Sequence, residues 1–256
     1  MRKPLVIGNW KMNGSLRFIE QLPKDLAEIC QWSREVEIVI CPPFVYLGET
    51  ARRVAPLGVK LGSQHVSEYQ EGAYTGEVGA AMLNDVGCSH VLIGHSERRA
   101  LFGADDARIA GQLTAALAVG LTPVLCVGED AAQRAAGQTW AVLERQLAAA
   151  GLADSSLTGG ETSRPDRGRM IIAYEPVWAI GGGQAAGPAD AQEVLGRIRQ
   201  ALGVVGEQIT LLYGGSVTSG NVAELMAQPD LDGVLVGGAS LRAREFTAIC
   251  EQAAMR

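Results

Sequence analysis

Short apolar runs recur along the whole chain, each followed by a longer segment of helical character, and no other feature limits the possible folds as strongly. The apolar runs are Pro4–Trp10, Val36–Cys41, Val59–Gln64, Ser89–Gly94, Leu121–Val127, Arg169–Glu175, Gln208–Tyr213 and Asp232–Val236. The helical segments are Leu16–Trp32, Tyr46–Val54, Val78–Asp85, Asp105–Val119, Ala131–Ala150, Ala189–Leu202, Asn221–Ala227 and Leu241–Ala254. The apolar runs do not alternate with polar residues, which indicates strands buried on both faces of a parallel sheet.

Eight strand–helix units in 256 residues, about 32 residues each, predict an α/β fold. This number of units favours a closed (β/α)8 barrel, with eight parallel strands inside and helices outside, over an open doubly wound sheet. No linker or abrupt change of composition divides the chain, so we expect residues 1–256 to form a single domain. Asp154–Gly168, rich in Ser, Thr, Gly and Arg, is expected to be the loop before the sixth strand.

The net charge of −6 argues against nucleic acid or an anionic membrane surface as a partner. No run of about 18 apolar residues predicts a membrane span, and the first residues lack the apolar core of a signal peptide. The five cysteines are odd in number and show no C-x-x-C spacing, which indicates reduced, mostly buried thiols rather than a disulfide or metal framework. We therefore expect a cytoplasmic protein.

In a barrel of this kind the chemistry takes place at the carboxyl ends of the strands. Polar, ionisable and glycine residues gather at these ends, in Asn9-Trp10-Lys11, Gln64-His65, Gly94-His95-Ser96-Glu97, Gly128-Glu129, Gly214-Gly215-Ser216 and Gly237-Gly238-Ala239-Ser240, and at Glu175. Stability alone does not explain this distribution, which therefore indicates an active site.

Glu175 ends the sixth apolar run and is the first candidate catalytic residue. Pro176 follows it and prevents regular strand pairing, because proline has no backbone N–H. Bulky apolar residues, Val177 and Trp178 among them, come next, and then the three glycines Gly181–Gly183. A stiff entry, an apolar tip and a flexible exit predict a lid that covers a site; the alternative is an ordinary surface loop.

The glycine pairs after the seventh and eighth strands predict a phosphate site. Backbone N–H groups approach a ligand closely at glycine, and the loops after strands seven and eight are the usual phosphate site of barrels. We expect a helix N-terminus to follow each pair. No Walker-type lysine follows either pair, which argues against a nucleoside triphosphate.

His95 and Lys11 supply the remaining chemistry. His95 precedes an expected helix start, with Ser96 as the cap, and the partial positive charge of that helix end should keep the imidazole neutral. Lys11 follows the first strand and provides a fixed positive charge, unless it is an ordinary surface lysine. Glu97 is a secondary candidate. A base, a polarising imidazole, a cation, a phosphate site and a lid together predict proton abstraction next to a carbonyl.

Five motifs resemble the triosephosphate isomerase family: Gly8-Asn9-Trp10-Lys11-Met12-Asn13, Gly94-His95-Ser96-Glu97-Arg98-Arg99, Ala173-Tyr174-Glu175-Pro176-Val177-Trp178-Ala179-Ile180-Gly181, Tyr213-Gly214-Gly215-Ser216-Val217 and Val236-Gly237-Gly238-Ala239-Ser240-Leu241. They occur in the family's order and extend from the first strand to the last. The resemblance implies a TIM barrel that interconverts dihydroxyacetone phosphate and glyceraldehyde 3-phosphate through an enediolate, as in glycolysis and gluconeogenesis, without metal or organic cofactor.

The resemblance also assigns roles. It implies that Glu175 moves the proton, that His95 polarises the carbonyl, and that Lys11 with Asn9 stabilises the intermediate, supported by Glu97. The phosphate would be bound by backbone N–H groups of four residues, Gly181, Ser216, Gly237 and Gly238. By the same resemblance the protein is a homodimer in which the loop 71–76 enters the partner and Thr75 reaches its active site.

The chain departs from the family pattern outside this set. Gly182, Gln184 and Ala185 replace the usual Thr, Lys and Thr of the lid, and the freedom of Gly182 predicts a less populated closed lid. His65 replaces an Asn and Ala104 a Glu near the expected dimer interface, which puts the strength of that interface in question.

Two alternatives remain at this point. An aldolase or epimerase of the same fold would show a Schiff-base lysine in the sixth strand or metal ligands at several strand ends, and neither is seen in the sequence. A catalytically silent scaffold would have lost Glu175, His95 or Lys11, and all three are present.

Overall fold

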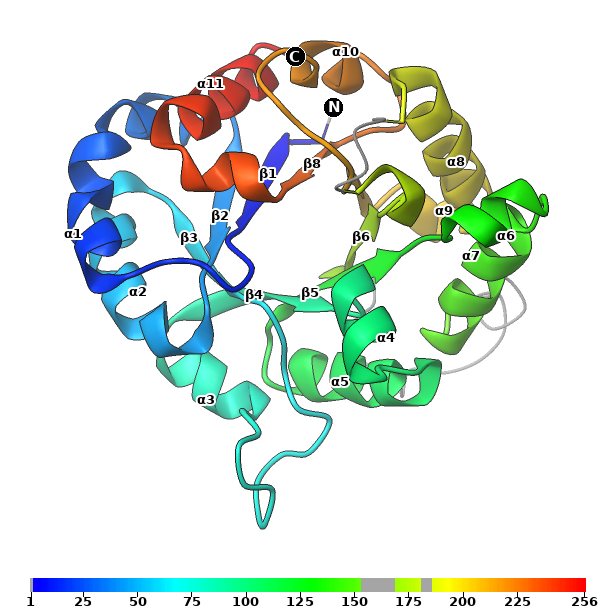
Figure 1. Ribbon diagram of the computed structural model, residues 1–256, viewed down its shortest axis with the longest axis horizontal. Helices are drawn as coiled ribbons and strands as arrows, with labels where there is room; N and C mark the ends of the chain where they lie inside the picture. Colours follow the sequence, from blue (N-terminus) through cyan, green and yellow to red (C-terminus); the bar gives the residue numbers. More distant parts are fainter. Residues whose placement is uncertain (1, 153–168, 181–185) are drawn as a thin grey trace.

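A computed structural model describes residues 2–152, 169–180 and 186–256 and shows a closed barrel of eight parallel strands. The strands are β1 (Leu5–Asn9), β2 (Glu37–Cys41), β3 (Lys60–Ser63), β4 (Cys88–Ile93), β5 (Thr122–Val127), β6 (Ile171–Tyr174), β7 (Thr210–Tyr213) and β8 (Gly233–Val236). They follow one another in chain order, and β8 pairs with β1 to close the ring (Figure 1). The predicted (β/α)8 barrel is confirmed.

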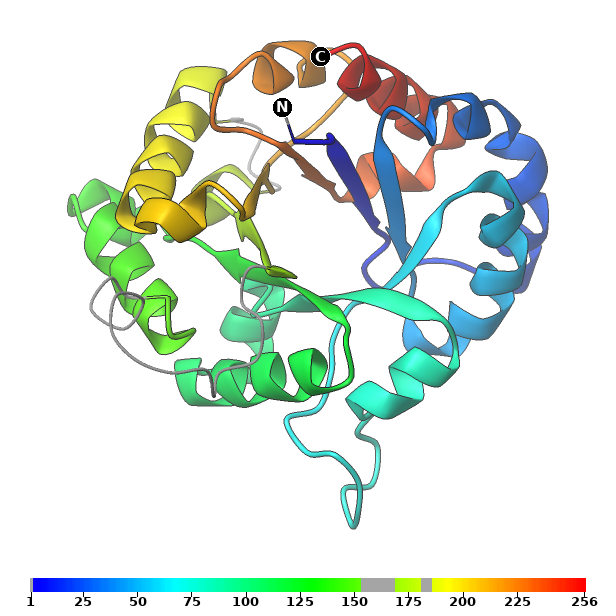
Figure 2. The ribbon, with the colours of Figure 1, turned by 180° about the vertical axis from the view of Figure 1, so that it is seen from behind.

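Helices surround the barrel on all sides in both views (Figures 1 and 2). The α-helices are α1 (Leu16–Asp25), α2 (Leu47–Val54), α3 (Ala80–Asp85), α4 (Ser96–Phe102), α5 (Asp106–Ala118), α6 (Ala131–Ala135), α7 (Thr139–Ala149), α8 (Pro188–Ala201), α9 (Gly203–Gly206), α10 (Val222–Met226) and α11 (Ala243–Ala254). Short 3-10 helices lie at Ala27–Trp32, Phe44–Tyr46, Ala55–Leu57, Val177–Ala179 and Gly238–Leu241.

Two of the expected helices are wrong in extent. The segment Leu16–Trp32 is not one helix: α1 contains Pro23 near its end, stops at Asp25 and is followed by a 3-10 helix. Proline removes one backbone donor and weakens the turn it enters. The segment Ala131–Ala150 is two helices, because Gly137 adopts a left-handed φ of 69° after α6 and so ends it. The expected loop Asp154–Gly168 and the lid glycines from Gly181 to Gly183, with Gln184 and Ala185, lie outside the described residues.

The strands are apolar on both faces because each face is buried against a different core. Side chains that point into the barrel form one cluster: Leu5, Ile7, Val39, Cys41, Leu92, Val124, Cys126, Ile171, Ala173, Leu212 and Leu235. A larger cluster lies between the sheet and the surrounding helices. This double burial is the reason that the strands show no alternation.

Four cysteines, Cys41, Cys88, Cys126 and Cys250, are free and buried. Burial raises the pKa of each thiol above its ordinary value, to about 12 for Cys88. Because the thiolate is the reactive form, these four side chains are protected from oxidation at neutral pH. Within the residues described, no helix has the length and apolar character needed to cross a membrane.

Gly128, directly after β5, is required by the close approach of β6. A Cβ atom at Gly128 would lie 1.8 Å from the backbone oxygen of Glu175. By contrast, a Cβ at Gly238 would meet no atom within 4 Å. The barrel therefore has no room for a side chain at the first position and ample room at the second.

We predict that Gly128→Ala lowers the free energy of unfolding by about 2–3 kcal/mol, because the end of β6 must shift to admit the methyl group. Gly238→Ala is the matched control and should change it by less than about 0.5 kcal/mol. Denaturant unfolding of both variants and the parent provides the comparison. Equal unfolding midpoints for the two variants would contradict this packing argument.

Candidate active site

Glu175 lies at the carboxyl end of β6 and is almost fully buried, with 2% of its surface exposed. Its Oε2 atom accepts the backbone N–H of Ser96 at 2.8 Å. Its Oε1 atom lies 3.0 Å from Nε2 of His95. The carboxylate thus extends across β5 to the end of β4, so the two predicted catalytic residues are in direct contact.

His95 is itself the N-cap of α4, a role that the sequence analysis assigned wrongly to Ser96. Its extended backbone places Nδ1 as the acceptor of the Glu97 backbone N–H, at 3.3 Å. An imidazole nitrogen has here taken the place of the usual side-chain oxygen of a cap. Because Nδ1 accepts, the proton of a neutral imidazole is on Nε2, the atom that faces Glu175.

The charge of His95 depends on its neighbour. Burial is the largest single cause and opposes protonation of the imidazole, but the charge and hydrogen bond of Glu175 and the charge of Glu97 together outweigh it, so the pKa of His95 is raised above its ordinary value. The helix terminus alone predicted a neutral imidazole, and in this arrangement the contact with Glu175 acts in the opposite direction. That expectation omitted a carboxylate that is far away in the sequence.

Lys11 has a φ of 54°, the only positive value among the described residues other than glycine. Two side-chain amides fix this left-handed backbone: Oδ1 of Asn9 accepts the Lys11 N–H at 3.0 Å, and Nε2 of Gln64 donates to the Lys11 carbonyl at 2.8 Å. Such a conformation costs about 1–2 kcal/mol and persists because the surrounding contacts enforce it. Lys11 is therefore not an ordinary surface lysine.

The Lys11 ammonium lies 2.6 Å from Oε1 of Glu97. Asn9, Lys11, His95 and Glu97 line one cavity of about 210 Å³ at the carboxyl end of the barrel. Gln64 shares this cavity and was missed as a site residue, because an amide at a strand end carries no chemical signal until its partners are known. The structure thus brings together all five predicted catalytic side chains: four line the cavity and Glu175 touches His95.

The predicted phosphate residues lie at the ends of β7 and β8. In the described part of the chain, the backbone N–H groups of Ser216, Gly237 and Gly238 have no protein acceptor. A Cβ at Gly237 would lie 3.6 Å from Cε of Lys11, so the lysine is close to this end. A helix follows each glycine pair: Gly238 begins a 3-10 helix, and α10 (Val222–Met226) lies within the predicted segment Asn221–Ala227. Gly181, the fourth predicted phosphate residue, lies outside the described residues.

The first part of the predicted lid is anchored on a buried carboxylate, Glu129, for which the sequence predicts no role. Its Oε1 accepts hydrogen bonds from Tyr174 at 3.1 Å and from Trp178 Nε1 at 2.9 Å. Arg134 lies 3.4 Å from the same oxygen and stacks on the Trp178 ring. Trp178 is thus held by polar contacts and is more than an apolar tip.

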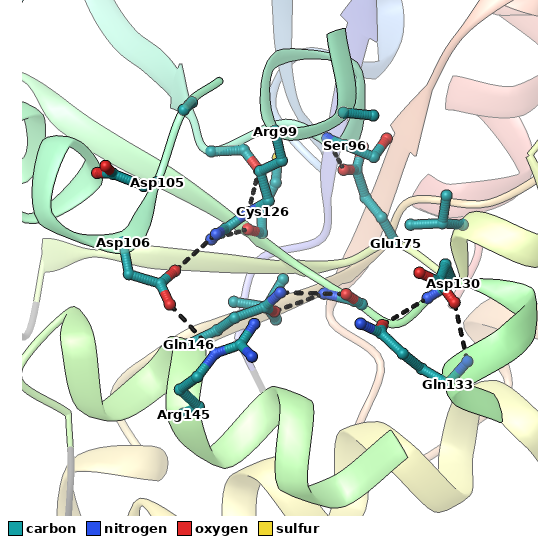
Figure 3. A pocket seen from close by; sticks show the side chains of 16 residues that line it. Ser96, Arg99, Asp105, Asp106, Cys126, Asp130, Gln133, Arg145, Gln146 and Glu175 are labelled. Atoms are coloured by element: carbon teal, nitrogen blue, oxygen red, sulfur yellow. Dashed lines mark hydrogen bonds and ion pairs between the residues drawn. The ribbon is translucent and has the colours of Figure 1, made fainter. Parts of the chain in front are cut away.

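A second cavity, of about 380 Å³, lies behind Glu175 (Figure 3). Its walls brace the active site from outside. Arg99 donates to the Gly94 and Cys126 carbonyls and pairs with Asp106 at 2.7 Å, while Gln146 exchanges two hydrogen bonds with the backbone of Gly128. These contacts hold the turns that carry His95 and that pass beneath Glu175.

Comparisons with known proteins agree on one family. The family model described as triosephosphate isomerase matches residues 4–253. A triosephosphate isomerase of Thiobacillus denitrificans is 48% identical over 99% of this chain and 100% of its own length. One of Alcanivorax borkumensis is 48% identical over 98% and 99%. A crystal structure of the Bartonella henselae triosephosphate isomerase is 38% identical, with a TM-score of 0.83, over 98% of this chain and 99% of that one.

We predict that Glu175→Gln lowers the pKa of His95, because the amide removes the charge that raises this pKa and leaves burial, which lowers it. NMR titration of the histidine ring carbons measures the change. Glu97→Gln should lower the pKa of His95 less. Glu207→Gln, at an exposed residue between α9 and β7, should leave the pKa of His95 unchanged. A His95 pKa that is the same in Glu175→Gln and the parent would refute the contact.

Proposed function

The chain belongs to the triosephosphate isomerase family and interconverts dihydroxyacetone phosphate and glyceraldehyde 3-phosphate, and on that premise we propose that Glu175, His95 and Lys11 carry out the reaction. The contact between Glu175 and His95 is the observation that carries this assignment. Neither an aldolase or epimerase nor a silent scaffold is favoured by the relatives, which are triosephosphate isomerases over their full length.

Glu175 is the base in this proposal. It removes a proton from one substrate carbon and returns it to the neighbouring carbon through an enediolate. To reach the substrate, the carboxylate must exchange its hydrogen bonds with Ser96 and His95 for the carbon acid. Its burial supports the role, because a carboxylate with few waters around it is a stronger base toward the substrate.

His95 donates a hydrogen bond from its Nε2–H to the substrate carbonyl and so polarises it. The Glu97 backbone N–H continues to occupy Nδ1, which preserves this tautomer throughout. Once Glu175 has turned to the substrate and taken up a proton, the charge that raises the pKa of His95 is gone and burial again favours the neutral ring. The neutral imidazole is thus a property of the reacting complex in this proposal.

Lys11 stabilises the negative charge that develops on the enediolate oxygens. Glu97 holds the ammonium in place, and Asn9 acts as a positioning residue through the Lys11 backbone. The phosphate binds to the backbone N–H groups of Ser216, Gly237 and Gly238, and of Gly181 when the lid closes. Proton transfer between neighbouring carbons requires no electron acceptor, and we propose that the enzyme works in the cytoplasm without metal or organic cofactor.

We also propose a homodimer. Apolar side chains are exposed on the segments that follow β1 to β4, on one side of the barrel: Met12, Phe44, Val45, Tyr69, Tyr74, Met82, Leu101 and Phe102. The loop between β3 and α3 projects from the same side (Figures 1 and 2), and Tyr69 stacks on Tyr74 within it. An apolar face of this kind is typical of a subunit interface. The exposed loop 71–76 would insert into the partner, with Thr75 at the partner's active site.

Isomerisation of glyceraldehyde 3-phosphate in a coupled assay tests the catalytic assignment. Glu175→Asp shortens the base by one methylene, and misplacement by about 1 Å should lower kcat roughly 100-fold with little change in KM. Glu97→Asp, which shortens a supporting residue by the same methylene, should lower kcat less than Glu175→Asp does. A kcat in Glu175→Asp close to that of the parent would remove Glu175 from the role of base.

Gln64→Ala tests the support of Lys11. Loss of the two bonds from Nε2 to the Lys11 and Cys41 carbonyls should release the left-handed backbone and lower kcat/KM about tenfold. Gln64→Glu retains the length but not the donor, so it should be impaired as well. Parent-like activity in both variants would show that Lys11 holds its position without this amide.

Val45→Asp tests the dimer. Val45 is 82% exposed beside β2, and a carboxylate there should dissociate the dimer in sedimentation experiments. Val204→Asp is the matched control, because Val204 is 83% exposed in α9, between β6 and β7. Equal sedimentation of both variants and the parent as dimers would place the interface elsewhere.

A further inference from the structure

A third cavity, of about 510 Å³, opens at the amino ends of the strands, the end seen in Figure 2 and opposite to Glu175. The first residues of several strands line it, among them Glu37, Lys60, Thr122 and Thr210. The apolar cluster inside the barrel separates this cavity from the active site. Its volume is in the range of small-molecule sites, about 300–1,000 Å³.

The charge of this amino-end cavity opposes that of the whole chain. Among the described residues, Lys3, Lys60 and Arg169 line it, against a single carboxylate, Glu37. Lys60 already neutralises Glu37, at 2.8 Å. Two positive charges therefore remain, in a protein whose net charge is −6. A concave surface concentrates the field of such charges.

The two remaining cations are available to a ligand. Within the described residues, Arg169 forms no ion pair or side-chain hydrogen bond. Lys3 donates to the carbonyl of Ser33 at 3.0 Å, a neutral acceptor that leaves its charge uncompensated. Among the described residues, neither Lys3 nor Arg169 has a carboxylate partner, whereas Lys60 is paired with Glu37.

Neutral hydrogen-bonding groups add to these charges. The side-chain hydroxyls of Thr122 and Thr210 line the cavity and have no partner in the part of the chain that is described. His90, 4% exposed, lines it as well, between Ser89 Oγ at 2.9 Å and Glu37 Oε1 at 3.4 Å. Burial lowers the pKa of His90 to about 4, so the ring is neutral at physiological pH. It can therefore serve as an NMR probe of the cavity without adding a charge there.

We propose that the amino-end cavity is a second anion site, in which Lys3 and Arg169 bind a small phosphorylated or polyphosphate anion with help from the Thr122 and Thr210 hydroxyls. Charge-assisted donors around an oxyanion are the strong hydrogen bonds of proteins, and arginine is the side chain best shaped for phosphate. The site is independent of the reacting phosphate, which binds at the opposite end of the barrel.

The three histidines allow both ends of the barrel to be observed in one sample. His90 lines the amino-end cavity and His95 the active site, so ring-labelled protein gives a separate NMR signal for each, assigned by His65→Gln and His90→Gln. Pyrophosphate is the first probe, titrated at constant ionic strength against sodium chloride. Fructose 1,6-bisphosphate is the second probe. Tighter binding of pyrophosphate would indicate an inorganic ligand, and tighter binding of the bisphosphate would indicate a phosphorylated sugar.

We expect the His90 signal to move saturably with pyrophosphate at concentrations where chloride has no effect. Arg169→Ala should weaken this binding about tenfold and leave both the His95 signal and isomerase activity unchanged. Lys24→Ala is the matched control, because it removes one exposed positive charge at the end of α1, outside the cavity. A His90 signal that does not move with either probe, or equal affinity in Arg169→Ala and Lys24→Ala, would overturn the proposal.

Discussion

The contact of Glu175 with His95 and with the backbone of Ser96 is the interaction on which the rest of the site depends. It joins the ends of β6 and β4 across β5, and this is possible only because Gly128 leaves room for the Glu175 backbone. Arg99 and Gln146 form hydrogen bonds with the backbone of the turns on either side, and these bonds support the positions of Glu175 and His95. These contacts fix the backbone that carries Glu175 and His95, so a movement of the Glu175 side chain starts from a rigid frame.

Charge in the active site is arranged as linked pairs rather than as isolated groups. Glu175 is in contact with His95, and Lys11 with Glu97, whose backbone N–H in turn occupies Nδ1 of His95. The neighbouring charges therefore act on His95: burial and Lys11 lower its pKa, and the carboxylates of Glu175 and Glu97 more than offset this. The backbone strain at Lys11 belongs to the same arrangement, because Asn9 and Gln64 enforce it at the residue that pairs with Glu97.

The apolar strands predicted a parallel sheet buried on both faces, and the eight strand–helix units favoured a closed barrel over an open sheet. The polar residues at the strand ends made Glu175, His95 and Lys11 candidate site residues. Gln64 and Glu129 could not be predicted, since their roles consist of contacts with residues distant in the chain. The cap at His95 was missed because imidazole is a rare capping group, and the break at Gly137 because an alanine-rich segment hides a single left-handed glycine. Local composition thus predicts the secondary-structure elements, whereas contacts between residues far apart in the chain decide the detailed geometry of the site.

The pairing of β1 with β8 has a consequence for how the chain is made. Leu5 pairs with Gly233, so the first strand cannot gain its second neighbour until nearly the whole polypeptide has left the ribosome. Until then the growing sheet has two open edges, each a template for association with another chain. Closure removes both edges at once. The finished enzyme is thus free of the hazard that accompanies its synthesis, and the interval before residue 233 emerges is the period in which a chaperone has most to protect.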